Sequence, residues 1–480
     1  MKRIPLSLGA PVVMLALFGG CTVGPHHVDA HPSLAPTAAA NASAAPVAPA
    51  AGPAQAITVG EAVPADWWTR FGSPALNALV ARALATNNDL ATADAALRQA
   101  REQAAAAFGS TLPQIDAGYQ AQRIRTSRIY SNPLQEPDNY RYTLHTAQVT
   151  VAYPLDLFGA GRNRVRSARA AAEVQRHRLE AARTTVVANL VLAVIQQASL
   201  QAQIDDATAS IRANRDILTM MQRRQQLGAI GAADVSAQET ALATAEGVLP
   251  PLTRALVHQQ AVISALVGQA PGNPLPPLPT LAELAVPADL PLSLPADLVR
   301  HRPDVRAAEA QMTGAAADVG SAIAARLPNI QLSATAGGVA EQFGQMFASG
   351  NPFWTLIGGV TQPLFHGGQL LHQQRAAEAA LDGAKAQYRA AVIQAFVDVS
   401  DALTGIQTDG AALDAAARAD DAAARNLTFV TRQLQLGGAG TLNLLNASAA
   451  RAQAALQLSQ ARAARLSDSV ALFQALGGGW

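Results

Sequence analysis

The residues that could perform acid–base or metal chemistry are few and poorly placed for it. Asp205-Asp206 and Asp420-Asp421 are adjacent acid pairs in stretches that we predict to be helical. Neighbouring side chains on a helix point about 100° apart, which suits a hydrated surface and not a cooperating acid–base pair. His366 and His372 do not share a helix face well. There is no His-Glu-x-x-His motif, clustered ligand set or glycine-rich phosphate loop. The sequence therefore predicts no enzyme, no metal site and no nucleotide site.

Cys21 has the clearest covalent chemistry, and as the only cysteine it cannot form an intrachain disulfide. Residues 1–20 have the layout of a secretory signal peptide, with a basic start, an apolar segment and two final glycines. A cysteine at this place resembles a bacterial lipobox, although Phe18 stands where leucine is usual. The resemblance implies cleavage before Cys21 and a covalent lipid on its thiol, with no other cofactor. Thr22, in place of an aspartate, implies export onward to the outer membrane. The alternative is an ordinary signal peptide with an incidental cysteine.

The composition favours long helices over one large globular core. Hydrophobic residues make up 50% of the 480 residues but aromatic residues only 4%, because alanine supplies much of the apolar share. Alanine is the best helix former and has little side chain to bury. The net charge of +1 gives no electrostatic footprint for nucleic acid. Beyond the signal, the longest apolar stretch, Val186 to Ile195, is broken by Asn189 and is too short for a transmembrane helix. A mature chain that spans a membrane would therefore use strands.

Two proline-rich stretches divide the mature chain. Residues 21–64 are rich in alanine, proline and serine and predict a flexible N-terminal tether. Residues 271–295 predict a linker between two halves, 65–270 and 296–480.

The two halves repeat each other in sequence. Leu112-Pro113-Gln114-Ile115 matches Leu327-Pro328-Asn329-Ile330, and later in the same order Leu227-Gly228 matches Leu436-Gly437. Such an internal two-fold repeat predicts a fold built from two copies of one unit.

Each half predicts the same series of elements, because alternating strand patterns follow the Leu-Pro and proline-free helical patterns follow the strands. The glycines after each long helix suit a helix end. In chain order, the first half has a helix over about 74–110, a β-hairpin over 113–154, a long helix over 161–227 and a return helix over 232–268. The second half has a helix over about 303–326, a hairpin over 328–365, a long helix over 368–436 and a return helix over 441–476.

Four amphipathic strands cannot stand alone in a bilayer, because their outer edges would expose unpaired backbone groups to hydrocarbon. A barrel needs about eight strands to fill its own interior and more to hold water. Several copies must therefore associate. Physics alone permits a dimer, a trimer or a tetramer, and a wide pore favours at least three copies. The long helices, at 1.5 Å per residue, would extend about 100 Å from the barrel.

Several short segments are distinctive in their order and spacing: Cys21–Pro25, Trp67-Trp68 with Phe71, Arg302–Glu309, Gln362–Phe365 with Gly367-Gly368, and Ala475–Trp480. Together they resemble the outer membrane factor family, the TolC-like outer membrane efflux proteins, in its NodT-type lipoprotein branch. The resemblance covers essentially the whole mature chain. It implies a mainly α fold: a homotrimer in which four strands per protomer make a 12-stranded transmembrane β-barrel on a long helical α-barrel. It also implies a lipid-anchored protein of the outer membrane whose helical part lies in the periplasm.

The family also implies a function and partners. A member is the passive exit duct of a tripartite efflux system, through which a periplasmic adaptor and an inner-membrane pump export drugs, metals or other small solutes. Two alternatives stay open. One is the outer-membrane duct of type I protein secretion, and the other is a periplasmic coiled-coil scaffold lipoprotein.

The resemblance implies candidate sites at the far ends of the long helices. The turns Gly228 to Gly231 and Gly437 to Gly440 would contact the adaptor, besides reversing the chain. Just after the second turn, Asn443 and Asn446 occupy positions that are commonly aspartate in a closed periplasmic entrance, so the cation selectivity of such an entrance is in doubt. The alternative is that one of these asparagines caps the start of the return helix and the other is exposed to solvent. Asp234 is the first-half equivalent of Asn443 and would either supply that charge or cap its own helix.

Overall fold

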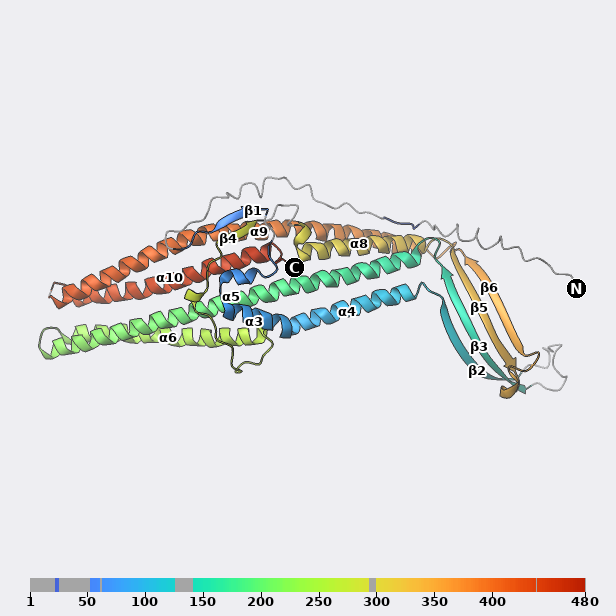
Figure 1. Ribbon diagram of the computed structural model, residues 1–480, viewed down its shortest axis with the longest axis horizontal. Helices are drawn as coiled ribbons and strands as arrows, with labels where there is room; N and C mark the ends of the chain where they lie inside the picture. Colours follow the sequence, from blue (N-terminus) through green and yellow to red (C-terminus); the bar gives the residue numbers. More distant parts are fainter. Residues whose placement is uncertain are drawn as a thin grey trace. The chain divides into compact units, whose positions relative to one another are not determined.

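The structure, a computed structural model, describes residues 22–25, 52–60, 63–125, 141–292, 299–436 and 438–479. The signal peptide, Cys21 and Gly437 lie outside these residues. The chain forms two compact units (Figure 1). The sheet unit comprises residues 1–30, 97–175 and 308–388, and the helical unit comprises residues 31–96, 176–307 and 389–480. Each unit takes segments from both halves of the sequence, because the long helix of each half continues from one unit into the other.

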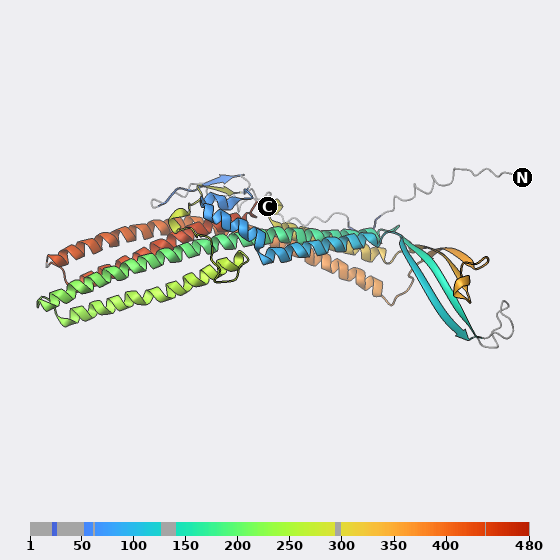
Figure 2. The same ribbon diagram turned by 60° about the horizontal axis from the view of Figure 1, so that its bottom comes forward.

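The sheet unit contains one antiparallel four-stranded sheet in the order β2-β3-β5-β6, whose strands lie side by side in Figures 1 and 2. The strands are β2 (Gln114–Arg125), β3 (Arg141–Leu155), β5 (Asn329–Ala340) and β6 (Pro352–Thr361). The two hairpins belong to different halves of the sequence and join through β3 and β5, in a register that sets Thr150 opposite Thr335. Within the described chain, β2 and β6 are each paired along one edge only.

The sheet has one polar and one apolar face. On the polar face, the hydroxyls of Thr150 and Thr335 are 3.3 Å apart. On the apolar face, the register sets Ala336 opposite Trp354, and Trp354 is 78% exposed. Ile115 from β2 is 70% exposed. Large apolar side chains left in the open on one face of a sheet indicate contact with something other than water.

The helices of the two halves have matching lengths, which reflects the internal repeat. The long helices α5 (Ala160–Gln226) and α9 (Gln369–Gln435) have 67 residues each. The return helices α6 (Ala232–Leu266) and α10 (Thr441–Ala475) have 35 residues each, and each runs beside its long helix (Figures 1 and 2). Among the described residues, α5 is the one helix with a stretch apolar and long enough to cross a membrane, and 67% of that stretch is buried inside the protein, which is typical of a core helix.

The first helix of the first half is broken in two, where the sequence predicted one helix over about 74–110. It forms α3 (Pro74–Thr86) and α4 (Asn88–Gly109). Asn87 lies between them with extended backbone dihedrals. Its Oδ1 accepts hydrogen bonds from the backbone N–H groups of Asp89 and Leu90, and its Nδ2 donates to the carbonyl of Leu266. In a continuous helix these backbone groups would bond to other backbone groups. At the break, the Asn87 side chain bonds to them instead.

The prediction of a flexible tether over 21–64 is wrong for its last part. Residues 56–59 form strand β1 (Ala56–Val59), which pairs in parallel with β4 (Asp289–Leu292). The β4 strand lies in the segment that the sequence predicted as a linker. Gln55, next to β1, is fully buried and bonds the carbonyl of Pro287 and the hydroxyl of Ser469. The tether was predicted from composition alone, and composition carries no information about hydrogen bonds to residues far along the chain.

Each unit has its own apolar core. In the sheet unit, Met312 and Val319 of α8 (Pro303–Ala324) pack with Leu381 of α9. In the helical unit, Trp67 of the 3-10 helix η1 (Trp67–Phe71) stacks on Phe473 of α10 with ring centroids 5.2 Å apart, and both rings are fully buried. Along α5, larger side chains such as Val187, Leu190 and Val194 are also fully buried, so the long helices do not pack through alanine alone.

Candidate functional site

The turn between α5 and α6 is built by glycine and an acidic cap. Gly228 has a positive φ of 73°, and its N–H donates to the carbonyl of Gln225. Gly231 is the N-cap residue of α6, and the carboxylate of Asp234 accepts a hydrogen bond from the Gly231 N–H at 3.3 Å. The sequence left two roles open for Asp234, a charge at the entrance or a helix cap. In the structure its carboxylate caps α6. The side chain just before the turn, Leu227, is 78% exposed.

The turn between α9 and α10 follows the same plan. The N–H of Gly438 donates to the carbonyl of Gln433, and Gly440 is the N-cap residue of α10. Gly437 lies outside the described residues. Leu436 and Leu442 flank the turn and are 79% and 67% exposed. Both turns therefore present exposed leucines beside glycine.

Asn443 and Asn446 lie three residues apart on the exposed side of α10, while Leu444 and Ala447 between and after them are buried. The first turn of α10 contains no acidic residue. Unlike Asp234 at the start of α6, Asn443 forms no capping box at the start of α10, so in the described residues it does not act as the cap that the sequence left open. The structure thus brings two neutral amides together next to the second turn, and Asp234 stays with the first.

Cys21 lies outside the described residues, but the segment that follows it has a defined place in the sheet unit. The N–H of Val23 donates to the carbonyl of Phe158, and Asn163 Nδ2 donates to the carbonyl of Val23 at 3.0 Å. Gly24 lies so close to Gly320 of α8 that a Cβ on Gly24 would come within 2.5 Å of the Gly320 Cα. The chain next to Cys21 is therefore held where β3 ends and α5 begins.

Arg302 and Asp398 join elements of the helical unit, a role that sequence reasoning did not assign. Arg302 is 8% exposed, and its guanidinium makes two hydrogen bonds to Asp304 and one to the carbonyl of Ala475. It also pairs with Asp398 of α9 at 2.8 Å. Burial acts to lower the pKa of Arg302, but the bonds and charges of Asp304 and Asp398 outweigh it and raise the pKa. The motif Arg302-Pro303-Asp304 stood out in the sequence. Its partners Asp398 and Ala475 could not be identified there, because they are distant along the chain.

Two carboxyl groups meet between α9 and α10 inside the helical unit. Asp468 is half-buried and hydrogen-bonds to Asp409. Gly405, one turn before Asp409, makes room for it, since a Cβ on Gly405 would lie 3.0 Å from Asp468 Oδ1. Burial and the neighbouring Asp409 carboxylate raise the pKa of Asp468 to about 7, against a lowering effect of Arg465. No sequence pattern indicated this pair, because neither aspartate belongs to a motif.

The described residues contain no group of three or more histidine, cysteine or acidic side chains that could hold a metal ion. The acid pairs and the two histidines considered first therefore form no cluster in this part of the chain. Among the described residues, the candidate site consists of the two turns, the amides of Asn443 and Asn446, and exposed leucine side chains.

Known proteins with similar sequences share this arrangement of helices and strands. The profile of the family described as "Outer membrane efflux protein" matches residues 79–269 and, a second time, residues 294–478. The chain belongs to this family. The two matches correspond to the two halves of the sequence, so the internal repeat is confirmed.

Relatives of this outer membrane efflux protein include proteins named for export. The pyoverdine export outer membrane protein OpmQ of Pseudomonas putida is 30% identical over 86% of this chain and 88% of its own length. The toluene efflux pump outer membrane protein TtgC of Pseudomonas putida is 29% identical over 100% of this chain and 96% of its own. The solvent efflux pump outer membrane protein SrpC of the same species is 28% identical over 85% of this chain.

Solved structures of outer membrane channels have the same fold. The outer-membrane channel OprN superimposes with a TM-score of 0.83 at 25% identity and covers 96% of this chain and 100% of its own. The outer membrane protein VceC from Vibrio cholerae does so with a TM-score of 0.80 at 27% identity, over 87% of this chain and 99% of its own. The predicted TolC-like fold, efflux function and outer-membrane location are confirmed. The family further implies that this outer membrane efflux protein works with partners in a tripartite assembly.

Proposed function

We propose that this outer membrane efflux protein is a homotrimeric, lipid-anchored exit duct that exports small organic solutes and has no enzymatic activity. The observation that carries the proposal is the sheet. It has four strands, two edges without partners in the described chain, and an apolar face whose large side chains are exposed. Such a sheet suits a bilayer only as part of a closed barrel.

The strand number favours three copies of the chain. Two four-stranded sheets give eight strands, which leave an interior just wide enough for side chains. Three give twelve strands and room for a water-filled pore. In the trimer, β2 of one copy would pair with β6 of the next and remove every edge.

The partners are an adaptor and an inner-membrane pump, and the two turns are the contact we propose for the adaptor. Leu227, Leu436 and Leu442 are exposed there, although apolar side chains of this size gain free energy on burial. Gly228 and Gly231 at one turn, and Gly437 and Gly440 at the other, let a partner approach the backbone closely. A partner helix or loop could bury the three leucines.

The solutes we propose are small organic molecules. The related proteins are named for export of pyoverdine, toluene and solvents, and none of these three names refers to protein secretion. We therefore place the duct of type I secretion second. A periplasmic scaffold is disfavoured because it would leave the apolar face of the sheet in water.

Asn443 and Asn446 are the positions we propose for the entrance of the duct. Three copies would place six amides around it, and amides donate and accept hydrogen bonds without a net charge. Such an entrance would not concentrate cations as a ring of carboxylates does. Asp234, which caps α6, is not included in this ring.

Electron microscopy of single particles extracted from outer membranes in mild detergent tests the proposal. We expect a hollow particle with three-fold symmetry and a barrel of twelve strands. A two-fold or four-fold ring would contradict the trimer but keep the duct. A solid rod or a compact monomer without a ring in end view would exclude the duct and favour the scaffold.

A further inference from the structure

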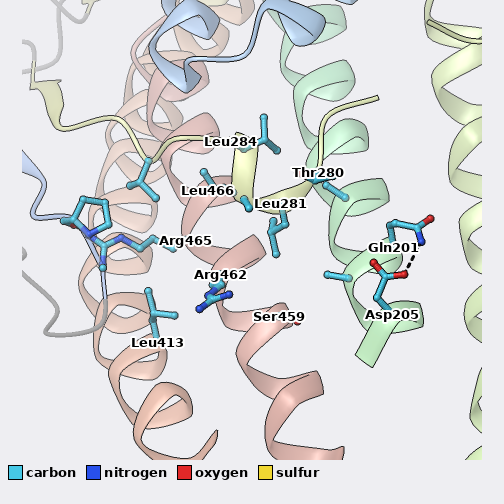
Figure 3. Close-up of a pocket in the computed structure, with 16 residues that line it drawn as sticks. Gln201, Asp205, Thr280, Leu281, Leu284, Leu413, Ser459, Arg462, Arg465 and Leu466 are labelled. Atoms are coloured by element: carbon cyan, nitrogen blue, oxygen red, sulfur yellow. Dashed lines mark hydrogen bonds between the residues drawn. The ribbon is translucent and has the colours of Figure 1, made fainter. Parts of the chain in front are cut away.

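A cavity of about 520 Å³ lies in the helical unit, and its lining includes no residue of the two turns. Helices α5, α9 and α10 form its walls, and the chain around the 3-10 helix η2 (Leu281–Glu283) and the residues before β1 border it. The size is that of a pocket for a small molecule, which is typically about 300–1,000 Å³. Leu281, Leu284 and Leu466 supply apolar surface, and two arginines lie on one side (Figure 3).

Arg465 of α10 is a buried cation that makes no direct ion pair in the described part of the chain. It is fully buried, its Nε donates to Gln55 Oε1, and its Nη2 donates to the carbonyl of Pro53. Its Nη1 has no hydrogen-bond partner, and no ion pair among the described residues includes Arg465. Two neutral acceptors explain how the arginine holds the segment before β1. Both acceptors are neutral, but the carboxylates of Asp414 and Asp468 attract the guanidinium without a direct ion pair, which offsets part of the cost of burying its charge.

A second arginine, Arg462, lines the cavity and is exposed to solvent. It precedes Arg465 by nearly one turn of α10. On the facing helix, Asp205 accepts a hydrogen bond from Gln201, and Figure 3 shows this pair across from the arginines. The cavity therefore has a positive side on α10, a negative position on α5, and leucines between them.

We propose that this cavity binds a small organic carboxylate with an apolar body. The carboxylate would lie against α10, where Arg462 can donate a charge-assisted hydrogen bond and the Arg465 charge adds to the attraction. The apolar body would lie along Leu281, Leu284 and Leu466. Asp205 repels a carboxylate from the opposite wall, so the ligand has one orientation.

The test uses the full-length protein in detergent and measures line broadening of 4-fluorobenzoate by ¹⁹F NMR. We expect broadening that excess unlabelled benzoate reverses, and none with 4-fluorobenzamide, which has the same ring but no charge. The Arg462→Gln variant should weaken binding about tenfold, because it removes a charge-assisted bond. The Asp205→Asn variant should bind more tightly, because it removes a repulsive charge.

Two further variants make the result decisive. Arg432→Gln changes an exposed arginine near the end of α9, outside the cavity lining, and should bind like the unchanged protein. Leu281→Trp fills the cavity and should abolish binding even though Arg462 is retained. Equal broadening with the benzamide, with protein-free micelles or with Leu281→Trp would overturn the proposal. So would a microscopy map in which a neighbouring copy fills the cavity.

Discussion

Three consecutive glycines, Gly477, Gly478 and Gly479, occupy positions where a side chain would not fit. All three have positive φ values, of 97°, 71° and 74°. A Cβ on Gly478 would lie 2.6 Å from the side chain of Thr184, and one on Gly479 would lie 2.5 Å from the carbonyl oxygen of Val63. The segment after α10 thus fits closely against three other parts of the helical unit. The same glycines carried part of the family resemblance, and their geometry gives the physical reason for that pattern.

The carboxyl pair of Asp468 and Asp409 predicts that stability depends on pH. The pKa of Asp468 in the folded chain, about 7, lies above its ordinary value of 3.8, so the folded state holds the proton more tightly. The pair's contribution is therefore fully present below about pH 4 and is lost as the pH rises through about 7. Asp414 and Arg465 are the other charged groups that act here.

We expect the Asp468→Asn variant to raise the melting temperature at pH 8 and to change it little at pH 5. An amide keeps a hydrogen bond to Asp409 without the repulsion of two carboxylates, a gain of about 1 kcal/mol. Thermal unfolding in detergent between pH 5 and 8 measures this. Asp401→Asn, at an exposed position on α9, is the control. A variant that stays as pH-dependent as the unchanged protein would exclude this pair as the cause.

Single residues of this kind could not be identified from the sequence. Arg465 depends on Gln55, which is 410 positions away, and Asp468 depends on space left by Gly405. No local pattern marks such partners. Asp234 was predictable in part, because an acidic residue three positions after a helix start is typical of a cap. That Asp234 caps α6, and does not supply charge at the entrance, could be seen only from the geometry of the turn.

At the scale of elements, the sequence was most informative where periodicity extends over many residues. The proline-free stretches and the glycines after them predicted both long helices to within a residue of α5 and α9. The Leu-Pro segments predicted the starts of β2 and β5 similarly well. Short elements with long-range partners were missed. Strand β1 has four residues and pairs with β4 across more than two hundred positions, so composition alone predicted a tether.

The break at Asn87 gives a prediction at this scale. Replacing Asn87 with alanine removes the cap of α4 and the bond to Leu266, and should destabilise the protein by about 1–2 kcal/mol. Thermal unfolding measures the loss. Asn87→Asp, which keeps the cap oxygen but not the donor, should cost less than alanine. An alanine variant with unchanged stability would mean that helix α3–α4 can run continuously.

At the scale of the whole molecule, the anchor and the barrel should be separable. We predict that Cys21→Ser removes the covalent lipid, seen as the loss of acyl mass in intact mass spectrometry. The trimer that we propose should persist, because the pairing that we propose between β2 and β6 of neighbouring copies does not involve the N-terminus. Detergent-resistant trimers on gels and electron microscopy measure this. An unchanged mass would contradict lipidation at Cys21, and monomers only would assign assembly to the anchor.

The equal lengths of matching elements restrict how this protein can change in evolution. Helices of 67 and 35 residues occur once in each half, and the two hairpins share one sheet through β3 and β5. An insertion in one half would move its turn away from that of the other half. A duplicated gene usually lets its copies diverge freely. Here an ancestral duplication has become a constraint, so that length changes must occur in both halves together, while side chains such as Asp234 and Asn443 remain free to differ.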